Sequence, residues 1–167
     1  MDVGGRGVLC SVQETDVLTF LKDLLFPIAM EHPFFGEIRF LRSVGWWEIE
    51  RLEEGFSTAL SLTIEAGREG PTGDQVRFYQ DVLAWYRNGH AELQPLLRDL
   101  WTNWSEDGEE VPADLRVHHH LAGFSIPPRP YPIEEAEWSV SVQPTYDDHQ
   151  FTFQMKGWTP WGHTVDG

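Results

Sequence analysis

The sequence predicts an α+β protein in which a largely antiparallel sheet of about six strands is covered on one face by a long central helix. Residues 71–104 carry apolar side chains at steps of three and four, which is the period of an α-helix. Short runs in which apolar and polar side chains alternate, typical of half-buried strands, lie on both sides of that segment. The connections between these runs are too short for a strictly alternating parallel arrangement.

The N-terminal part is expected to contribute a flexible end and one short helix. Residues 1–12 are rich in glycine, which is typical of a mobile terminus. Residues 15–30 are predicted to hold a short amphipathic helix that packs on the body of the domain and ends near Pro27. The apolar side chains on its face are Val17, Phe20, Leu21, Leu24 and Leu25.

Strands are predicted between residues 37 and 66. The clearest is 58–66, because its apolar residues alternate with serine, threonine and glutamate. The other two are 37–43 and 46–52, joined by a hairpin turn.

The central segment, 71–104, begins with the pattern of a capping box, since Thr72 offers an N-cap hydroxyl and Gln75 follows three residues later. Asn88-Gly89 and Pro95 would ordinarily break a helix. The apolar stripe nevertheless keeps its phase across both. We therefore expect either one kinked helix or two nearly collinear helices.

The C-terminal part, residues 115–165, is predicted to return to strands after an acidic loop. Two of its strands alternate cleanly and form a half-buried antiparallel hairpin. The predicted strands are 115–126, 138–143 and 151–156, with room for one more short strand after residue 157. The whole chain, 1–167, has a length that suits a single domain.

The charge of the chain restricts its partners. Acidic residues number 27 against 12 basic ones, for a formal net charge of −15. Such a charge opposes binding to nucleic-acid phosphates or to anionic membranes, so a basic protein partner is expected. No apolar run reaches the ~18 residues of a membrane span. The single cysteine, Cys10, cannot form an internal disulfide, which favours a cytoplasmic location.

Tryptophan is the most distinctive residue of the composition, with eight copies. Neighbouring strand residues point to opposite faces, so Trp46 and Trp47 cannot both enter one core. Exposed tryptophan beside acidic residues is a plausible anchor for a basic partner, although a second helix layer could also bury it. The predicted partner-binding residues are Trp46, Glu48, Glu50, Trp158 and Trp161.

The run from His118 to His120 is the strongest candidate for a metal-binding motif in the sequence. On a strand, His118 and His120 share a face and could supply two zinc ligands. Alternation directs His119 toward the core and places Arg116 beside the other two, and a cation disfavours a metal site. Ordinary surface histidines are therefore the main expectation. No catalytic or cofactor-binding motif is present, so no catalytic residue and no cofactor is predicted.

Seven short motifs are spread over residues 33–167. They are Pro33-Phe34-Phe35-Gly36, Trp46-Trp47, Leu60 to Ile64, Gly70-Pro71-Thr72-x-x-Gln75, Trp138-Ser139-Val140-Ser141, Asp147-Asp148-His149-Gln150-Phe151 and Asp166-Gly167. Together they resemble those of a family of uncharacterised small bacterial α+β domains, a domain of unknown function. The resemblance covers about residues 33–167 and implies a fold but no catalytic residues. Similar small acidic domains serve as immunity proteins in bacterial toxin systems, so the resemblance implies such a role.

Three functions are therefore open from the sequence. The first is a non-enzymatic protein-binding module, an immunity-type antagonist that covers a basic toxin with an acidic, tryptophan-rich surface. The second is a metal-dependent hydrolase that uses His118, His120 and a carboxylate. The third is a structural or regulatory domain that self-associates through exposed aromatic residues.

Overall fold

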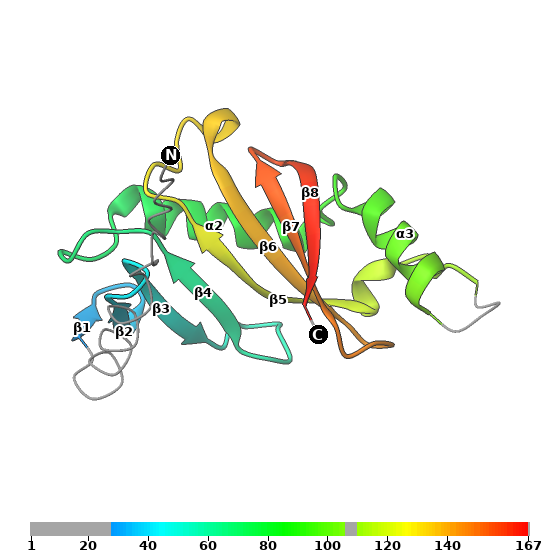
Figure 1. The fold of residues 1–167 in the computed structure, drawn as a ribbon, viewed down its shortest axis with the longest axis horizontal. Helices are drawn as coiled ribbons and strands as arrows, with labels where there is room; N and C mark the ends of the chain where they lie inside the picture. The colour runs from blue at the N-terminus through cyan, green and yellow to red at the C-terminus, as the bar shows by residue number, and fades with distance from the viewer. Residues whose placement is uncertain (1–27, 106–109, 167) are drawn as a thin grey trace, which may run out of the picture.

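The computed structural model describes residues 28–105 and 110–166, which form one eight-stranded mixed sheet with two α-helices on one of its faces (Figure 1). The strands are β1 (Ile28–His32), β2 (Gly36–Leu41), β3 (Trp46–Arg51), β4 (Leu60–Ile64), β5 (His119–Ile126), β6 (Glu137–Pro144), β7 (Gln150–Lys156) and β8 (Thr159–Asp166). The helices are α2 (Gly73–Arg87) and α3 (Gln94–Trp104), with short 3₁₀ turns η1 (Leu115–Val117) and η2 (Ile133–Glu135).

The strands lie in the sheet in the order in which they occur in the chain. All neighbours are antiparallel except β4 and β5, which are parallel, with Leu62 opposite Phe124. The sheet is thus two four-stranded meanders joined along one parallel seam, and α2 and α3 form the long connection that a parallel pair requires.

The predicted fold, a largely antiparallel sheet of about six strands under a long, kinked or split central helix, is wrong. The sheet is mixed and has two further strands, and residues 71–104 hold two shorter, separate helices instead of one long helix or a nearly collinear pair. β1 replaces the end of the helix predicted over 15–30, and residues 15–27 of that prediction lie outside the described residues, as does the flexible end predicted over 1–12. β8 is a full strand of eight residues. The strand predicted over 115–126 begins only at His119, after η1.

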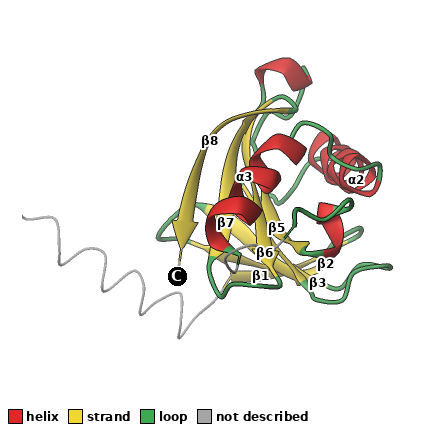
Figure 2. Ribbon diagram, turned by 90° about the vertical axis from the view of Figure 1, so that its right-hand side faces the viewer, coloured by secondary structure: helices red, strands yellow, loops and turns green. Residues whose placement is uncertain are grey.

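The two helices are not collinear, since α3 turns away from the axis of α2 (Figure 2). The backbone N–H of Asn88 donates to Ala84 O and that of Gly89 donates to Tyr86 O, which ends α2. Gly89 has φ +104° and His90 has φ +35°, so the backbone enters the left-handed region at two successive residues. The apolar stripe keeps its phase because each helix buries one side against the same face of the sheet.

The start of α2 is locked to the seam of the sheet. The predicted capping box is confirmed, with Gln75 N donating to Thr72 Oγ1 and Thr72 N donating to Gln75 Oε1. The amide group of buried Gln75 also donates to Glu65 O (2.9 Å) and to Pro127 O (3.1 Å), just beyond the ends of β4 and β5. One side chain therefore holds the helix N-terminus against both parallel strands.

Both helices pack on the same face of the sheet, which we call the inner face. Phe78 of α2 meets Trp138 of β6, and Trp104 of α3 meets Phe151 of β7, each with ring centroids 5.3 Å apart. The inner-facing strand residues are almost all buried and apolar. Neither helix is long and apolar enough to cross a membrane within the described part of the chain.

The opposite side of the sheet, the outer face, carries no helix among the described residues. Its side chains are mainly the polar half of the alternating strands, together with two tryptophans. They are Glu37, Arg39, Trp46, Glu48, Glu50, Ser61, Thr63, Ser125, Glu137, Ser139, Ser141, Thr152, Gln154, Lys156 and Trp161.

Candidate functional site

The outer face is hollowed into a trough that crosses the sheet. One hollow of ≈ 380 Å³ lies over β2 and β3, and a second of ≈ 170 Å³ lies over the seam. A third, of ≈ 300 Å³, reaches from Trp46 of β3 to Trp161 of β8. The first and second share Ser61, and the second and third share Thr63, Ser125 and Ser139, so the three are continuous.

Short hydroxyl side chains form the floor of the trough. The backbone N–H of Ser139 donates to Ser125 Oγ at 2.8 Å, and the hydroxyls of Ser141 and Thr152 lie 2.8 Å apart. At Gly123 an added Cβ would lie 1.9 Å from the carbonyl oxygen of Ser61, so only glycine allows β4 and β5 to pair here. The outward side chains of the central strands are small and polar, so the surface over these strands forms the bottom of the trough.

Acidic side chains line the trough at both ends. Glu37, Glu48 and Glu50 stand at the β2–β3 end, where the one basic neighbour in the hollow is Arg39, directly opposite Glu48. Glu65 and Glu137 line the other end, and Lys156 lies 3.7 Å from the carboxylate of Glu137. The excess of carboxylates makes the outer face attractive to cationic groups.

Four of the five predicted partner-binding residues come together on this face. Trp46, Glu48 and Glu50 alternate on β3 with buried residues, and Trp161, which is 67% exposed, stands at the far wall of the third hollow. Trp158 lies on the helix side instead, where its ring stacks on Trp85 with centroids 5.5 Å apart.

The two histidines predicted as zinc ligands have different surroundings in the structure. His118 ends η1 and packs on the Trp101 ring, with its Nδ1 3.2 Å from Thr145 Oγ1. His120 lies on β5 and lines a different cleft, with Arg116. In residues 28–105 and 110–166, no group of three or more His, Cys, Asp or Glu side chains is placed to hold a metal ion.

His119 is fully buried on the inner face, as its position in the alternation predicts. The Nδ1 of His119 lies 2.9 Å from Leu115 O and must donate to it, because a carbonyl oxygen can only accept. The Nε2 of the same ring then accepts a hydrogen bond from the hydroxyl of Tyr146 at 2.8 Å. Burial lowers the pKa of His119, so the ring is held neutral. The pKa of buried His90 is lowered by burial as well.

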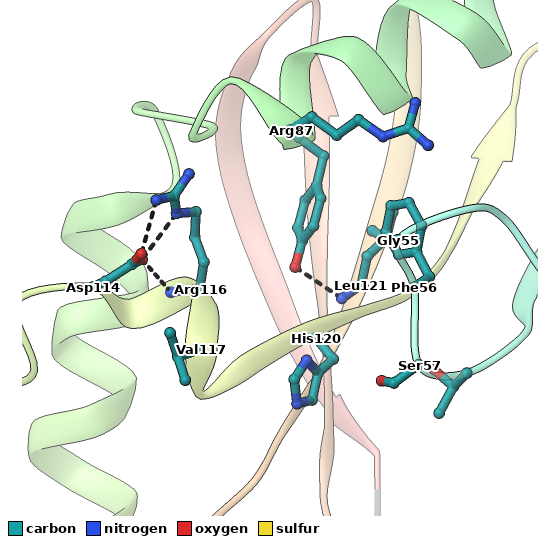
Figure 3. A pocket seen from close by; sticks show the side chains of 11 residues that line it. Gly55, Phe56, Ser57, Arg87, Asp114, Arg116, Val117, His120 and Leu121 are labelled. Atoms are coloured by element: carbon teal, nitrogen blue, oxygen red, sulfur yellow. Dashed lines mark hydrogen bonds and ion pairs between the residues drawn. The ribbon is translucent and has the colours of Figure 1, made fainter.

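A second cleft, on the side of the molecule that carries α2, was not anticipated from the sequence. Arg87, Arg116 and Phe56 line it (Figure 3), and so does Tyr86. These residues come from three separate segments, so no local motif marks them.

Comparison of the chain with protein-family models, with curated proteins and with solved structures found no match in any of the three. The resemblance to a family of small bacterial domains therefore stays a prediction.

Proposed function

We propose that the protein is a non-enzymatic binding module of the cytoplasm whose outer face binds a basic protein. The observation that carries this proposal is the placement of Trp46, Glu48, Glu50 and Trp161 on one open face of the sheet. Residues far apart in the chain supply these side chains, and the strand pairings, including the parallel pair β4–β5, bring them to a common surface.

The chemistry of the face suits a cationic protein surface. Exposed carboxylates attract lysine and arginine over long range and speed encounter. Tryptophan at the edge of a trough supplies the large apolar contact area that commonly dominates binding energy. Small hydroxyls between them let a partner backbone approach closely. No histidine or cysteine lines the three hollows. The described residues therefore offer no cysteine nucleophile there, and no imidazole base that could activate a serine hydroxyl.

An immunity-type role follows from this proposal if the partner is a toxin. An acidic face that covers a basic substrate-binding cleft would exclude the substrate without any chemistry of its own. Self-association is less well supported, because two chains with a net charge of −15 repel each other, most strongly at low salt.

The test combines capture with mapping. The wild-type chain is used to capture basic proteins from native cell extract, and each captured protein is identified, purified and mixed with the chain to form the complex. Hydrogen exchange of the chain's backbone amides is then measured with and without the partner. We expect protection of β3, β7 and β8. We also expect at least a tenfold loss of affinity in the double variant Glu48→Lys, Glu50→Lys.

The matched control reverses two exposed charges outside the outer face, Glu134→Lys and Glu135→Lys on η2. It should bind within about twofold of wild type, because it changes the net charge equally but leaves the trough intact. Equal loss in both double variants, or protection confined to the helix side, would overturn the proposal.

A further inference from the structure

The third hollow of the trough lies where β5 and β6 part from each other. Their pairing ends at Phe124 and Val140, whereas β5 stays paired with β4 to its last residue and β6 is paired with β7 from its first. The two strands diverge beyond that point (Figure 1). There the backbone N–H of Ser139 donates to the side-chain oxygen of Ser125, at 2.8 Å. The hollow is therefore a gap between the two strands that opens on the outer face.

Tryptophan lines this gap from strands far apart in the sheet. Trp46 belongs to β3 and Trp161 to β8. Met155 of β7 pairs with Pro160 and Gln154 pairs with Gly162, so Trp161 has no residue opposite it. A residue left over in this way bends its strand and redirects its side chain. The bulge in β8 thus helps to present Trp161 at the hollow.

Two carboxylates stand on opposite sides of the gap. Trp47 of β3 lies opposite Ile64 of β4, and the same register, continued by one residue, sets Glu65 opposite Trp46. The Cβ atoms of such opposite residues lie roughly 5 Å apart, so the Glu65 carboxylate and the Trp46 ring are neighbours. Glu137 begins β6, across the gap. Both glutamates line the hollow, and both are exposed.

The hollow carries an excess of negative charge. No lysine or arginine is among the described residues that line it. The nearby cation is Lys156, which pairs with Glu137 across β6 and β7 and has its Nζ 3.7 Å from the carboxylate. Both side chains of this pair are more than half exposed, and such pairs are weak. A cation from a partner can therefore take the place of Lys156.

We propose that the third hollow receives an arginine side chain of the basic partner. The guanidinium lies on the Trp46 ring and between the carboxylates of Glu65 and Glu137, and Trp161 covers it from the far side. This inference rests on the proposed function, because the arginine belongs to the protein that the outer face binds.

The geometry favours arginine over lysine. A guanidinium is flat, stacks on an indole ring and directs five N–H donors outward in one plane, so it can bond to carboxylates on two sides at once. The ammonium of lysine is a compact and strongly hydrated charge that cannot stack in this way. Tryptophan and arginine are also the residues that most often dominate the binding energy of an interface.

The probe is the tripeptide glycyl-arginyl-glycine, acetylated and amidated at its ends and titrated into the isotope-labelled full chain. Chemical shifts of the backbone and indole N–H groups report where it binds. We expect the largest shifts at residues 46, 63–65, 137–139 and 161. The arginine peptide should bind at least fivefold more tightly than its lysine analogue. The citrulline analogue, which keeps the shape without the charge, should give no saturable shift.

The principal variant is the double substitution Glu65→Gln, Glu137→Gln at exposed positions, which should leave the fold intact. We expect the Kd of the arginine peptide to rise about tenfold, because two charge-assisted hydrogen bonds are weakened. The matched control, Glu134→Gln with Glu135→Gln on η2, changes the net charge equally and should bind within about twofold of wild type. Lys156→Gln removes the competing cation and should lower the Kd about twofold.

The captured partner provides the second measurement. Each of its arginines is replaced by lysine in turn, and one replacement should lower the affinity at least tenfold. The same replacement should cost little further affinity when the chain carries Glu65→Gln and Glu137→Gln, because interacting residues are not additive. Equal binding of the arginine and lysine peptides, shifts away from the hollow, or an unchanged Kd in the double variant would overturn the inference.

The inference and the proposed function can fail separately. If Glu48→Lys with Glu50→Lys abolishes partner binding while Glu65→Gln with Glu137→Gln leaves it unchanged, the outer face binds its partner and the inference is refuted. If the arginine peptide binds in the hollow but the partner protects only the helix side, the proposed function is refuted and the selectivity of the hollow for arginine is upheld.

Discussion

The inner and outer faces of the sheet are built from alternate residues of the same strands, yet they have opposite properties. Inner residues such as Phe153 and Val140 are fully buried, whereas Ser139 and Ser141, the outward-facing neighbours of Val140 on β6, line an open trough. The stability of the fold is therefore concentrated on one face, and the other face is free to carry acid and exposed tryptophan without much cost in stability.

The largest expected effect is on the inner face. Phe153→Ala removes a fully buried ring and should lower the free energy of unfolding by about 3–5 kcal/mol, measured by urea denaturation. The neighbouring Thr152→Ala removes one hydrogen bond to Ser141 and should cost about 1 kcal/mol. Similar losses in the two variants would contradict the division of stability between the faces.

At the seam between β4 and β5 the backbone of Ser61 lies directly against Gly123, and Gly123→Ala tests whether this close approach is needed for stability. The new methyl group would overlap the carbonyl of Ser61, so β4 and β5 must separate, and a loss of about 3 kcal/mol is expected. Gly162→Ala is the control, because its Cβ would sit at 4.0 Å from Gln154 Cβ without overlap. Its cost should stay below about 1 kcal/mol in the same denaturation experiment.

The buried histidines should make stability depend on pH. The pKa of His119 and of His90 lies below the ordinary value of 6.5 because both are buried. Below pH 6.5 these two histidines bind protons in the unfolded chain but not in the folded chain. Their contribution to the free energy of unfolding is therefore complete above pH 6.5 and decreases as the pH falls toward their pKa values in the folded protein.

Urea unfolding between pH 7.5 and pH 5 measures this slope. His119→Gln should reduce it, because one of the two buried rings is removed. Exposed His163→Gln serves as the control and should leave the slope unchanged. A wild-type stability that stays constant over this range would mean that neither buried ring resists protonation.

The smallest expected effect on stability is at the exposed tryptophan of the outer face. Trp161→Ala should change the free energy of unfolding by no more than about 0.5 kcal/mol, because the side chain is 67% exposed. Its affinity for a basic partner should nevertheless fall by about tenfold. A large loss of stability with no loss of affinity would show that Trp161 belongs to the core of the fold.

Local patterns were sufficient for much of the molecule. The alternation of β3 and β4 identified which residues face outward, and the capping box at Thr72 identified the start of α2. Burial of His119 also followed from alternation. In each case, neighbouring residues alone determine the outcome, because strand pleat and helix capping are short-range properties.

The rest depended on tertiary contacts. β1 contains alanine, methionine and glutamate, and β8 contains Pro160 and Gly162, so neither has a strong strand signal, and each forms by pairing with a neighbour. The apolar stripe of 71–104 survived the break between α2 and α3 because both helices cover the same face. Periodicity reports which side of a helix is buried, but it does not report the direction of the axis.

The sequence by itself determined the acidic surface, the alternating strands and the tryptophan-bearing character of the chain. Only the tertiary structure decided that Trp46 and Trp161 share a trough while Trp158 packs under α2, and that Arg87 and Arg116 line one cleft with Tyr86. The physical reason is that strand order and the parallel seam arise from pairings between distant segments. The sites formed by those pairings have no signature within any one segment.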